Sequence, residues 1–455
     1  MVVFRRQRTD PQSRMLAVWA NGERVGTWSV AGDEHRFQYD QAWLSSAATR
    51  WLSLSLPFTP DNSAHRGAAV LNFFENLLPD SDAIRRRLRD KFATGSSAPF
   101  DLLAAIGRDC VGAIQLLPIG EAPDGFDHIA AKPLTEAGVA HAIHNAVAVG
   151  RVLGQQDADD FRISIAGAQE KTALLWHRRK WCRPLGATPT THIFKLPLGL
   201  VGNLRADMKT SVENEWLCAQ IIARLGLPVA DCEMARFGDQ RVLVVERFDR
   251  ALLHPAGAPP WLARLPQEDF CQALGQPGAK KYEADGGPGI RAILRQLDNS
   301  SQAAADKLVF IQAQLAFWLM AATDGHAKNF SIFLQRGGGY RLTPLYDVLS
   351  AWPIIGTGPN EIHPRRAKLA MAVRGKNAHY HLHEIRTRHW LQLALQSGVP
   401  GAFDQMVALV LQVPHALDQV AATLPKDFPT TVFEPIRRGM LVQAGLFADE
   451  LNELA

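Results

Sequence analysis

The sequence predicts an α+β fold in which a β-rich small lobe precedes a helical large lobe, with a small β-containing subdomain before both. Two patterns predict it: short apolar strands dominate up to about residue 250, and apolar residues at helical spacing dominate after it. The chain has 455 residues, of which 47% are hydrophobic and 21% charged, so it can bury more than one core. We expect three domains, over residues 1–125, 126–250 and 251–455.

The opening subdomain begins with a predicted hairpin. Residues 17–19 and 25–30 read as strands, and the Asn21-Gly22 pair between them tolerates the positive φ of a tight turn. Helices over 67–77 and 81–92 and a strand over 111–117 follow, and a Pro/Gly-rich stretch at 118–125 marks the boundary. The helix over 81–92 is rich in arginine, which fits either a solvated face or a nucleic-acid patch.

The next segment carries the strands of the small lobe. Phe161, Ile163 and Ile165 alternate with polar residues, which predicts a strand that forms a hairpin with residues 172–176. Strands over 180–184 and 191–196, a helix over 211–225 with Ser211 as its N-cap, and strands over 233–237 and 241–248 follow. A loop, a lysine-bearing strand, a glutamate-bearing helix and two strands come in this order in the nucleotide-binding lobe of protein kinases, so we expect a protein-kinase-like two-lobed body.

The last segment reads as helical. Leu308, Ile311, Leu315 and Leu319 recur at three- and four-residue steps, which predicts a buried helix over 306–322. Residues 389–395, 402–413, 415–424 and 433–450 are also periodic at helical spacing. These helices would build the large lobe.

Composition narrows the function classes. The net charge of +4 permits nucleic-acid binding without indicating it. The five cysteines are scattered and form no Cys-x-x-Cys pair, which favours reduced thiols over a zinc site. The N-terminus lacks a signal-peptide core, and the longest apolar run, residues 315–322, is far shorter than the roughly 20 residues that span a bilayer. We therefore expect a cytoplasmic protein with no membrane segment.

The run from Thr323 to Asn329 carries the strongest chemical signal. Asp324 and Asn329 stand five apart, as the aspartate and asparagine do in the kinase loop H-R-D-x-x-x-x-N, and Asp347 follows where a kinase has its D-F-G aspartate. Asp324 would be the base, and Asn329 and Asp347 the Mg²⁺ ligands. Each aspartate alone could instead cap a helix or end a strand, but the three residues at this spacing favour phosphoryl transfer.

Lys195 lies in an apolar strand, where a lone ammonium is costly to bury unless a phosphate or carboxylate compensates it. Glu215, or else Glu213, could hold it; the alternative is a strand face open to solvent. The loop over 166–171 contains one glycine and matches neither common phosphate-binding motif. From the residues alone, Ser164 before that loop is a plain strand hydroxyl.

Nine segments together resemble the HipA family of bacterial toxin kinases, from about residue 15 to residue 430. They are residues 54–57 (Leu-Ser-Leu-Pro), 73–80 (Phe-Phe-Glu-Asn-Leu-Leu-Pro-Asp), 107–113 (Gly-Arg-Asp-Cys-Val-Gly-Ala), 161–175, 190–197, 245–250, 265–269, 323–331 and 342–350.

The resemblance implies a serine/threonine protein kinase that uses ATP and Mg²⁺, with Asp324, Asn329, Asp347 and Lys195 in the roles given above. It also implies a set of nucleotide contacts: Ala166, Gly167, Ala168, Gln169, Glu170, Lys171, Lys195, Glu246, Arg247, Phe248, His326, Ala327, Lys328, Asn329, Tyr346 and Asp347.

The same resemblance implies a biological role. The kinase would be the toxin of a type II toxin–antitoxin pair that phosphorylates an aminoacyl-tRNA synthetase, with glutamyl-tRNA synthetase as the family's substrate, and so arrests growth. Autophosphorylation on Ser164 would inactivate it, because nearly two added negative charges would eject the adjoining loop. A HipB-like helix-turn-helix antitoxin dimer would bind it and make most of the contacts to operator DNA.

Two other functions remain open from the sequence. The chain could be a catalytically idle co-repressor in an antitoxin–DNA complex, or a small-molecule phosphotransferase with the same site. The set of Lys195, Asp324, Asn329 and Asp347 favours an enzyme, because a scaffold has no need for metal and base groups.

Overall fold

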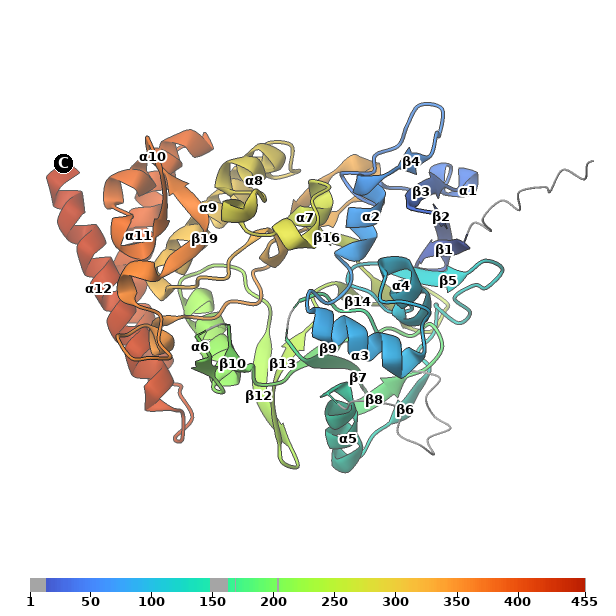
Figure 1. The fold of residues 1–455 in the computed structure, drawn as a ribbon, viewed down its shortest axis with the longest axis horizontal. Helices are drawn as coiled ribbons and strands as arrows, with labels where there is room; N and C mark the ends of the chain where they lie inside the picture. Colours follow the sequence, from blue (N-terminus) through green and yellow to red (C-terminus); the bar gives the residue numbers. More distant parts are fainter. Residues whose placement is uncertain (1–13, 148–162, 168, 203, 455) are drawn as a thin grey trace, which may run out of the picture.

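The computed structural model describes residues 14–147, 163–167, 169–202 and 204–454. Three bodies are seen in Figure 1: the N-terminal subdomain in blue, the strand-rich small lobe in green, and the helical large lobe in yellow to red. The predicted α+β class, with a β-rich lobe before a helical one, is confirmed. The three domain boundaries stay a prediction.

The N-terminal subdomain is an antiparallel sheet of order β4-β3-β2-β1-β5 covered by helices. The predicted hairpin is present, with Asn21 and Gly22 both at positive φ and Ala20 paired with Glu23. Its elements are β1 (Arg14–Ala20), β2 (Glu23–Ala31), β3 (Glu34–Tyr39), α1 (Gln41–Leu44), β4 (His65–Arg66), α2 (Ala68–Glu75), α3 (Asp82–Phe92), α4 (Pro99–Ile106) and β5 (Ile114–Pro118).

The small lobe is an antiparallel sheet of order β12-β13-β9-β7-β8-β6, with α6 packed on β12 and β13. Helix α6 begins at Ser211 after Thr210, so Ser211 is not the N-cap that we predicted; its hydroxyl instead accepts from the Leu198 amide. The elements are β6 (Ala131–Pro133), α5 (Glu136–Val147), β7 (Lys171–His177), β8 (Lys180–Pro184), β9 (His192–Lys195), β10 (Gly199–Val201), β11 (Ala206–Met208), α6 (Ser211–Arg224), β12 (Cys232–Phe237), β13 (Gln240–Glu246), β14 (Arg250–Leu253) and β15 (Trp261–Arg264).

The predicted hairpin between residues 161–165 and 172–176 is wrong for its described part. Strand β7 pairs with β8 and β9, whereas Ile163 bridges Asp109 and Gly167 bridges Pro79. Phe161 and Arg162 lie outside the described residues. The segment before β7 therefore finds its backbone partners in the N-terminal subdomain, which a local sequence pattern cannot reveal.

The large lobe is built around α9, whose residues are buried on nearly all sides. The segments 402–413 and 415–424, which we predicted as two helices, form one helix from Ala402 to Ala421 that continues through Pro414, because Val413 and Leu417 on either side of the proline are packed in the core. The elements are β16 (Gln267–Asp269), α7 (Phe270–Ala273), η1 (Gly278–Lys280), η2 (Glu283–Asp285), α8 (Ile290–Leu297), α9 (Ala303–Met320), η3 (Ala327–Asn329), β17 (Ser331–Leu334), η4 (Arg336–Gly338), β18 (Tyr340–Leu342), η5 (Trp352–Ile354), η6 (Pro364–Arg366), β19 (Lys368–Arg374), β20 (Ala378–His381), η7 (Leu382–Glu384), α10 (Thr387–Ser397), α11 (Ala402–Ala421) and α12 (Thr430–Leu454).

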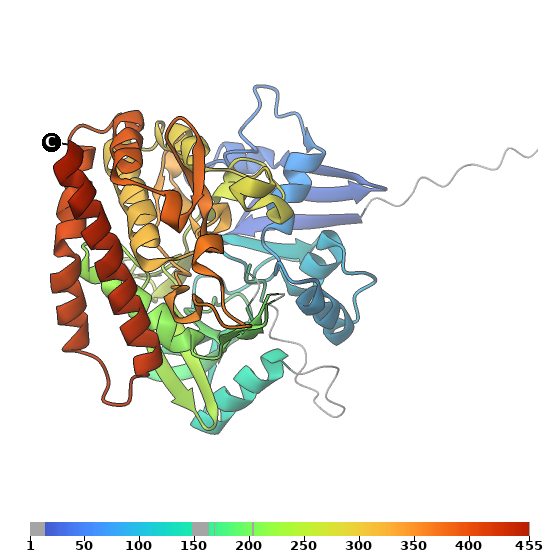
Figure 2. The same ribbon diagram turned by 60° about the vertical axis from the view of Figure 1, so that its left-hand side comes forward.

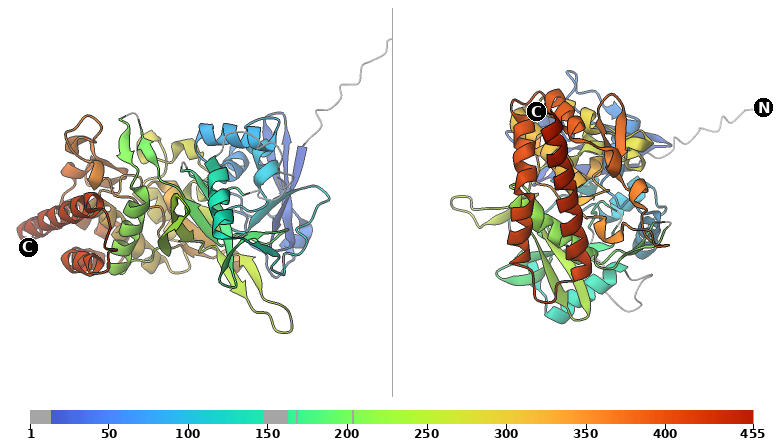
Figure 3. Two further views of the ribbon diagram at one scale, coloured as in Figure 1. Left: turned by 90° about the horizontal axis from the view of Figure 1, so that it is seen from below. Right: turned by 90° about the vertical axis from the view of Figure 1, so that its left-hand side faces the viewer.

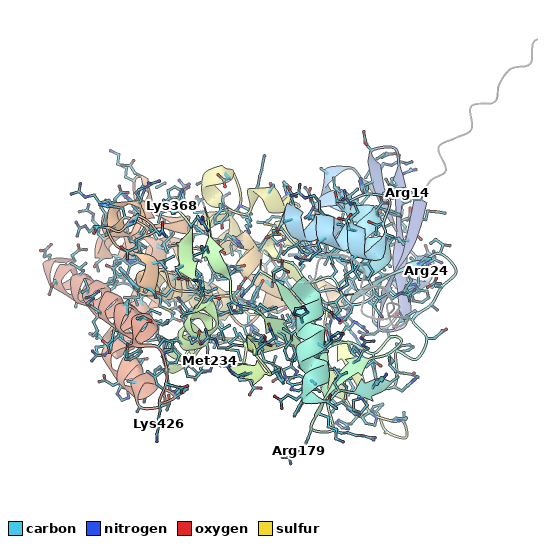
Figure 4. The ribbon with its side chains drawn as sticks, turned by 60° about the horizontal axis from the view of Figure 1, so that its bottom comes forward. Arg14, Arg24, Arg179, Met234, Lys368 and Lys426 are labelled. Carbon is cyan, nitrogen blue, oxygen red and sulfur yellow. The ribbon has the colours of Figure 1, made fainter. Side chains whose placement is uncertain are left out.

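The last two helices close the outer side of the large lobe. Helices α11 and α12 lie side by side, as Figures 2 and 3 show, and both also contact α6 and α9. The large lobe and the N-terminal subdomain lie at opposite ends of the molecule: in Figure 4, Lys368 and Lys426 mark one end and Arg14 and Arg24 the other. Between these ends, helix α2 of the N-terminal subdomain packs directly on α7 of the large lobe (Figure 1).

A buried ionic network joins the N-terminal subdomain to the small lobe. The Asp109 carboxylate lies 2.9 Å from Arg250, 3.2 Å from Arg264 and 3.4 Å from Arg247. Asp249 pairs with Arg247 at 2.8 Å and with Arg250 at 3.0 Å. All five side chains are almost fully buried, so each charge depends on the others for compensation.

None of the helices in the described residues is long and apolar enough to cross a membrane. All five cysteines are free thiols, and four of them are buried. The arginine-rich helix α3 exposes Asp82, Arg86 and Asp90, which agrees with the predicted solvated face, while Arg85 pairs with Glu75 at 3.1 Å and Arg87 pairs with Glu170. The alternative of a nucleic-acid patch stays a prediction.

Candidate active site

The loop after α9 holds Asp324 and Asn329 together. Helix α9 ends at Ala321 in the left-handed conformation, which turns the chain into the loop. The Asn329 side-chain nitrogen and the His326 amide both donate to the Asp324 carbonyl, each at 2.8 Å. The Asp324 carboxylate stays about half exposed, with a relative side-chain exposure of 55%, so an incoming hydroxyl could reach it.

Asp347 follows β18 and lines the same cleft as this loop. Its backbone has φ of +59°, a conformation that costs energy for a residue other than glycine and that clusters at functional sites. Burial tends to raise the pKa of its carboxyl, but the ammonium groups of Lys195 and Lys171 lower that pKa to about 2. The carboxylate is therefore ionised at neutral pH, as a metal ligand must be.

Lys195 connects the two sides of the cleft. Its ammonium nitrogen lies 2.5 Å from Glu215 on α6 and 2.8 Å from Asp347. The side chain is 9% exposed, which removes the alternative of a solvated strand face. Burial and the nearby Asp347 charge raise the pKa of Glu215 to about 7 although Lys195 lowers it. Glu213 pairs with Arg241 instead, so Glu215 is the partner of Lys195.

A second lysine lies beside Lys195. Lys171 on β7 is the direct cross-strand partner of Lys195 on β9, and its ammonium donates to the Ala166 carbonyl. Burial lowers the pKa of Lys171 to about 8, and the neighbouring Lys195 charge acts in the same direction. Two parallel cations at this wall of the cleft would attract a polyanion such as a triphosphate.

These groups line one cleft, and most of the predicted nucleotide contacts lie on its wall. Residues from both lists that line it are Ala166, Gly167, Lys171, Lys195, Glu246, Arg247, Phe248, Asp324, His326, Lys328, Asn329, Tyr346 and Asp347. Phe248 and Tyr346 lie close together, with ring centroids 5.7 Å apart, and offer aromatic surface on the wall of the cleft.

Other predicted contacts lie elsewhere. Gln169 and Glu170 line a separate cavity beside α3, where Glu170 pairs with Arg87, and Ala327 is fully buried. Ala168 lies outside the described residues. The Arg247 guanidinium points into the ionic network with Asp109. Its amide donates to the Thr191 carbonyl and its carbonyl accepts from the Arg250 amide, so Arg247 meets the cleft with its polar groups already engaged.

Ser164 lies just behind the cleft wall. Its hydroxyl donates to the Leu77 carbonyl at 2.8 Å, its amide donates to the Asp109 carbonyl at 3.0 Å, and the residue is 0% exposed. It is thus a buried tether to the N-terminal subdomain, and not the plain strand hydroxyl that its neighbours in the sequence suggest.

The structure adds four polar residues to this site: Asp80, Asp269, Lys281 and Tyr282. Asp80, Asp269 and Lys281 line the cleft, and the Tyr282 hydroxyl donates to the Asp324 carboxylate. Burial raises the pKa of Asp269 to about 6. In the sequence, Asp80 and Asp269 end two of the nine segments given above, residues 73–80 and 265–269, and this position could have drawn attention to them; Lys281 and Tyr282 carry no such signal.

The donor set suits a magnesium–nucleotide complex better than a free-standing metal site. Among the described residues, no three His, Cys, Asp or Glu side chains are placed to hold a metal ion. Asp347 is ionised, and Asn329 uses its amide nitrogen on Asp324, which leaves the amide oxygen for a cation. Mg²⁺ is commonly bound by one or two such groups together with substrate phosphates, so the residues fit it.

Lys171 and Lys195 line this cleft from the strand-rich lobe, and the half-exposed Asp324 carboxylate lines it from the helical lobe. A two-lobed fold with that division is a kinase. Comparison with known proteins agrees with this class. Family models for the HipA N-terminal domain and the HipA-like C-terminal domain match residues 16–117 and 163–423. The chain belongs to the HipA family.

Relatives and one solved structure support the assignment. Y4mE of Sinorhizobium fredii, described as a candidate kinase, is 34% identical over 85% of this chain and 86% of its own. The serine/threonine-protein kinase toxin HipA of Shewanella oneidensis is 25% identical over 71% of this chain and 72% of its own. A solved complex of Shewanella oneidensis HipA, HipB and operator DNA contains a chain with a TM-score of 0.75 and 23% identity, over 95% of this chain and 97% of that one. At 23% identity, the likeness to this solved structure shows a shared fold.

Proposed function

We propose that this chain is the toxin of a type II toxin–antitoxin pair and transfers phosphate from Mg-ATP to serine or threonine hydroxyls. The observation that carries the proposal is that Lys195, which pairs with Glu215 and Asp347, lines the same cleft as Asp347, Asp324 and Asn329. These groups come from both lobes, and phosphoryl transfer needs them all at one place.

Each residue would have a distinct part in the transfer. Lys195 and Lys171 would bind the phosphates, and Asn329 and Asp347 would hold Mg²⁺, which neutralises charge on the phosphates when bound. Asp324 would accept the proton of the acceptor hydroxyl. The acceptor oxygen forms a bond to the γ-phosphorus, the bond from that phosphorus to the bridging oxygen breaks, and ADP leaves.

The proposed substrate is an aminoacyl-tRNA synthetase, and glutamyl-tRNA synthetase is the first candidate. Its phosphorylation in the cytoplasm would stall translation and arrest growth. We further propose that a HipB-like helix-turn-helix dimer neutralises the kinase and carries it to operator DNA. Membership of the HipA family supports both parts, and the Shewanella relative of the same fold was solved with HipB and operator DNA.

We propose autophosphorylation on Ser164 as the route to inactivation. The support is the burial of this hydroxyl against the Leu77 carbonyl. A phosphate there would bring about two negative charges and several acceptors into a space that holds one neutral hydroxyl. The segment would have to leave, and it would take Ala166 and Gly167 out of the cleft wall with it.

Incubation with labelled ATP and Mg²⁺, with and without purified glutamyl-tRNA synthetase, tests the proposal. Label on the synthetase supports the kinase toxin. No label on any protein would favour the idle co-repressor, and label found only on small alcohols would favour a small-molecule phosphotransferase.

The autophosphorylation site is tested by Ser164→Ala. This variant should lose self-labelling and keep transfer to the synthetase. Ser397→Ala is the matched control, since Ser397 is also a buried serine whose hydroxyl donates to a backbone carbonyl, at 2.7 Å. Self-labelling that persists in Ser164→Ala at the wild-type level would contradict the assignment.

A further inference from the structure

The turn after α2 brings the N-terminal subdomain into the catalytic cleft. Asn72 and Asn76 donate from their side chains to the carbonyls of Gly275 and Gln276, at 2.8 and 2.9 Å. The Asp80 amide donates to the Gly167 carbonyl at 3.1 Å. Asn76 and Asp80 both line the cleft, so this subdomain forms part of its wall.

The Asp80 carboxylate bridges two lysines from different segments of the large lobe. One oxygen lies 2.8 Å from Lys281 and the other 3.0 Å from Lys328. Burial tends to raise the pKa of Asp80, but the two ammonium groups lower that pKa well below its ordinary value. The carboxylate therefore stays charged and holds both cations at neutral pH.

Both lysines are coupled to the residues proposed for chemistry. Lys328 lies next to Asn329 in the chain, is 6% exposed, and also donates to the carbonyl and side-chain oxygens of Asn76. The Lys281 carbonyl accepts from the Ala327 amide at 3.2 Å, so Lys281 is tied to the loop that carries Asp324 and Asn329.

We propose that Asp80 is a positioning residue of the kinase, which fixes the loop carrying Asp324 and Asn329 through Lys328 and Lys281. The inference rests on the proposed function and extends it, because it makes the N-terminal subdomain a part of the active centre. The turn after α2, which lies outside the two kinase lobes, would then fix the positions of the residues that transfer the phosphate.

Charge balance makes the inference distinguishable from a merely structural role. Asp80 compensates one of the two positive charges of Lys281 and Lys328, which both line the cleft. Without the carboxylate, both cations face the cleft uncompensated and attract a polyanion more strongly. At the same time, the loop loses its tether and the transfer geometry loosens. ATP affinity and turnover should therefore change in opposite directions.

The test is Asp80→Asn, which keeps the side-chain shape and removes the charge. Two quantities are measured on the full-length chain: the Kd of a fluorescent ATP analogue with Mg²⁺, and the rate of phosphate transfer from labelled ATP. We expect transfer to slow by about tenfold to a hundredfold, the cost of a displaced reacting group, with a lower Kd. Glu75→Gln is the matched control, because Glu75 forms an ion pair in the same turn region but lies outside the cleft.

A second variant tests the same bridge from its other side. Lys281→Gln removes one cation and leaves the carboxylate on Lys328, so it should slow transfer and raise the Kd for the analogue. Asp80→Glu, which restores the charge, should recover part of the transfer rate that Asp80→Asn loses.

Two results would overturn the role of Asp80: transfer by Asp80→Asn within about twofold of wild type, or a weaker ATP affinity that falls in step with its turnover. If the wild-type protein transfers no phosphate, that result counts against the proposed function. The Kd measurements would still test the bridge from Asp80 to Lys281 and Lys328, because Asp80→Asn should lower the Kd and Lys281→Gln should raise it. If Asp80→Asn fails to fold, Lys281→Gln alone decides, and unchanged transfer and Kd in that variant would reject the inference.

Discussion

The ammonium nitrogen of Lys195 lies 2.8 Å from the Asp347 carboxylate, although 152 positions separate the two residues in the sequence. One cation thus joins the strand-rich wall of the cleft to the proposed metal ligand.

Replacing Lys195 with methionine should weaken ATP binding by at least about tenfold, because a buried charge-assisted contact of this kind contributes about 1.5–3 kcal/mol. A titration with a fluorescent ATP analogue measures the effect. Lys209→Met serves as the control, since Lys209 is 69% exposed on the surface. Equal Kd values for wild type and Lys195→Met would remove Lys195 from the nucleotide site.

Asp324→Ala should abolish phosphate transfer and leave the fold intact, since the half-exposed carboxylate makes few structural contacts. Loss of a general base slows such reactions by about a hundredfold to ten-thousandfold. Transfer is followed with labelled ATP, and the thermal midpoint reports on folding. Asp90→Ala, on an exposed face of α3, is the control. Autophosphorylation that persists in Asp324→Ala would assign the base elsewhere.

Tyr282→Phe should increase the hydrolysis of ATP in the absence of a protein acceptor. The Tyr282 hydroxyl donates to the Asp324 carboxylate and so occupies the position that an acceptor hydroxyl or water needs. Removing a hydrogen bond to a charged group should raise hydrolysis by about tenfold. Phosphate release is the measurement and Tyr380→Phe the control. Slower hydrolysis would show that Tyr282 orients the base and does not compete for it.

Glu268 should make stability depend on pH. Burial raises its carboxyl pKa to about 8, and one of its oxygens has no hydrogen-bond partner. Because the pKa in the folded state is above the unfolded value of 4.5, the stabilisation is fully present below pH 4.5 and is lost as the pH rises through 8.

In the wild type, this group should lower the free energy of unfolding by about 1 kcal/mol per pH unit between pH 5 and about pH 8. Glu268→Gln has no carboxyl group at this position, so this pH dependence should be absent from the variant. Thermal midpoints measured across this range for wild type, Glu268→Gln and the exposed control Glu34→Gln would check it. Parallel pH profiles for wild type and Glu268→Gln would contradict the expectation.

Sequence reasoning found the residues whose signal is local. Asp324 and Asn329 share one short loop, and Lys195 stands out because an apolar strand surrounds it. The structure brings these residues together with Asp347, and their chemical roles stay a prediction. The order of strands and helices was likewise readable, because alternation and helical periodicity are properties of neighbouring residues.

What escaped the sequence depends on contacts between distant segments. Asp80 meets Lys281 across 201 positions, and no periodicity encodes that approach. The segment before β7 alternates like a hairpin strand, yet Ile163 pairs with Asp109 because the N-terminal subdomain docks there. Pro414 reads as a helix end, but the buried residues around it hold the helix together.

The buried network around Asp109 constrains how such proteins can recombine. If the chain were cut near residue 125 and the first part exchanged for another domain, Arg247 and Arg250 would keep the carboxylate of Asp249, and Arg264 would lose its ion pair with Asp109. Uncompensated buried cations cost several kcal/mol each. A fusion or domain swap at this junction would therefore fail unless the new domain placed a carboxylate where Asp109 lies. We expect the HipA N-terminal and C-terminal domains to be inherited together for this reason.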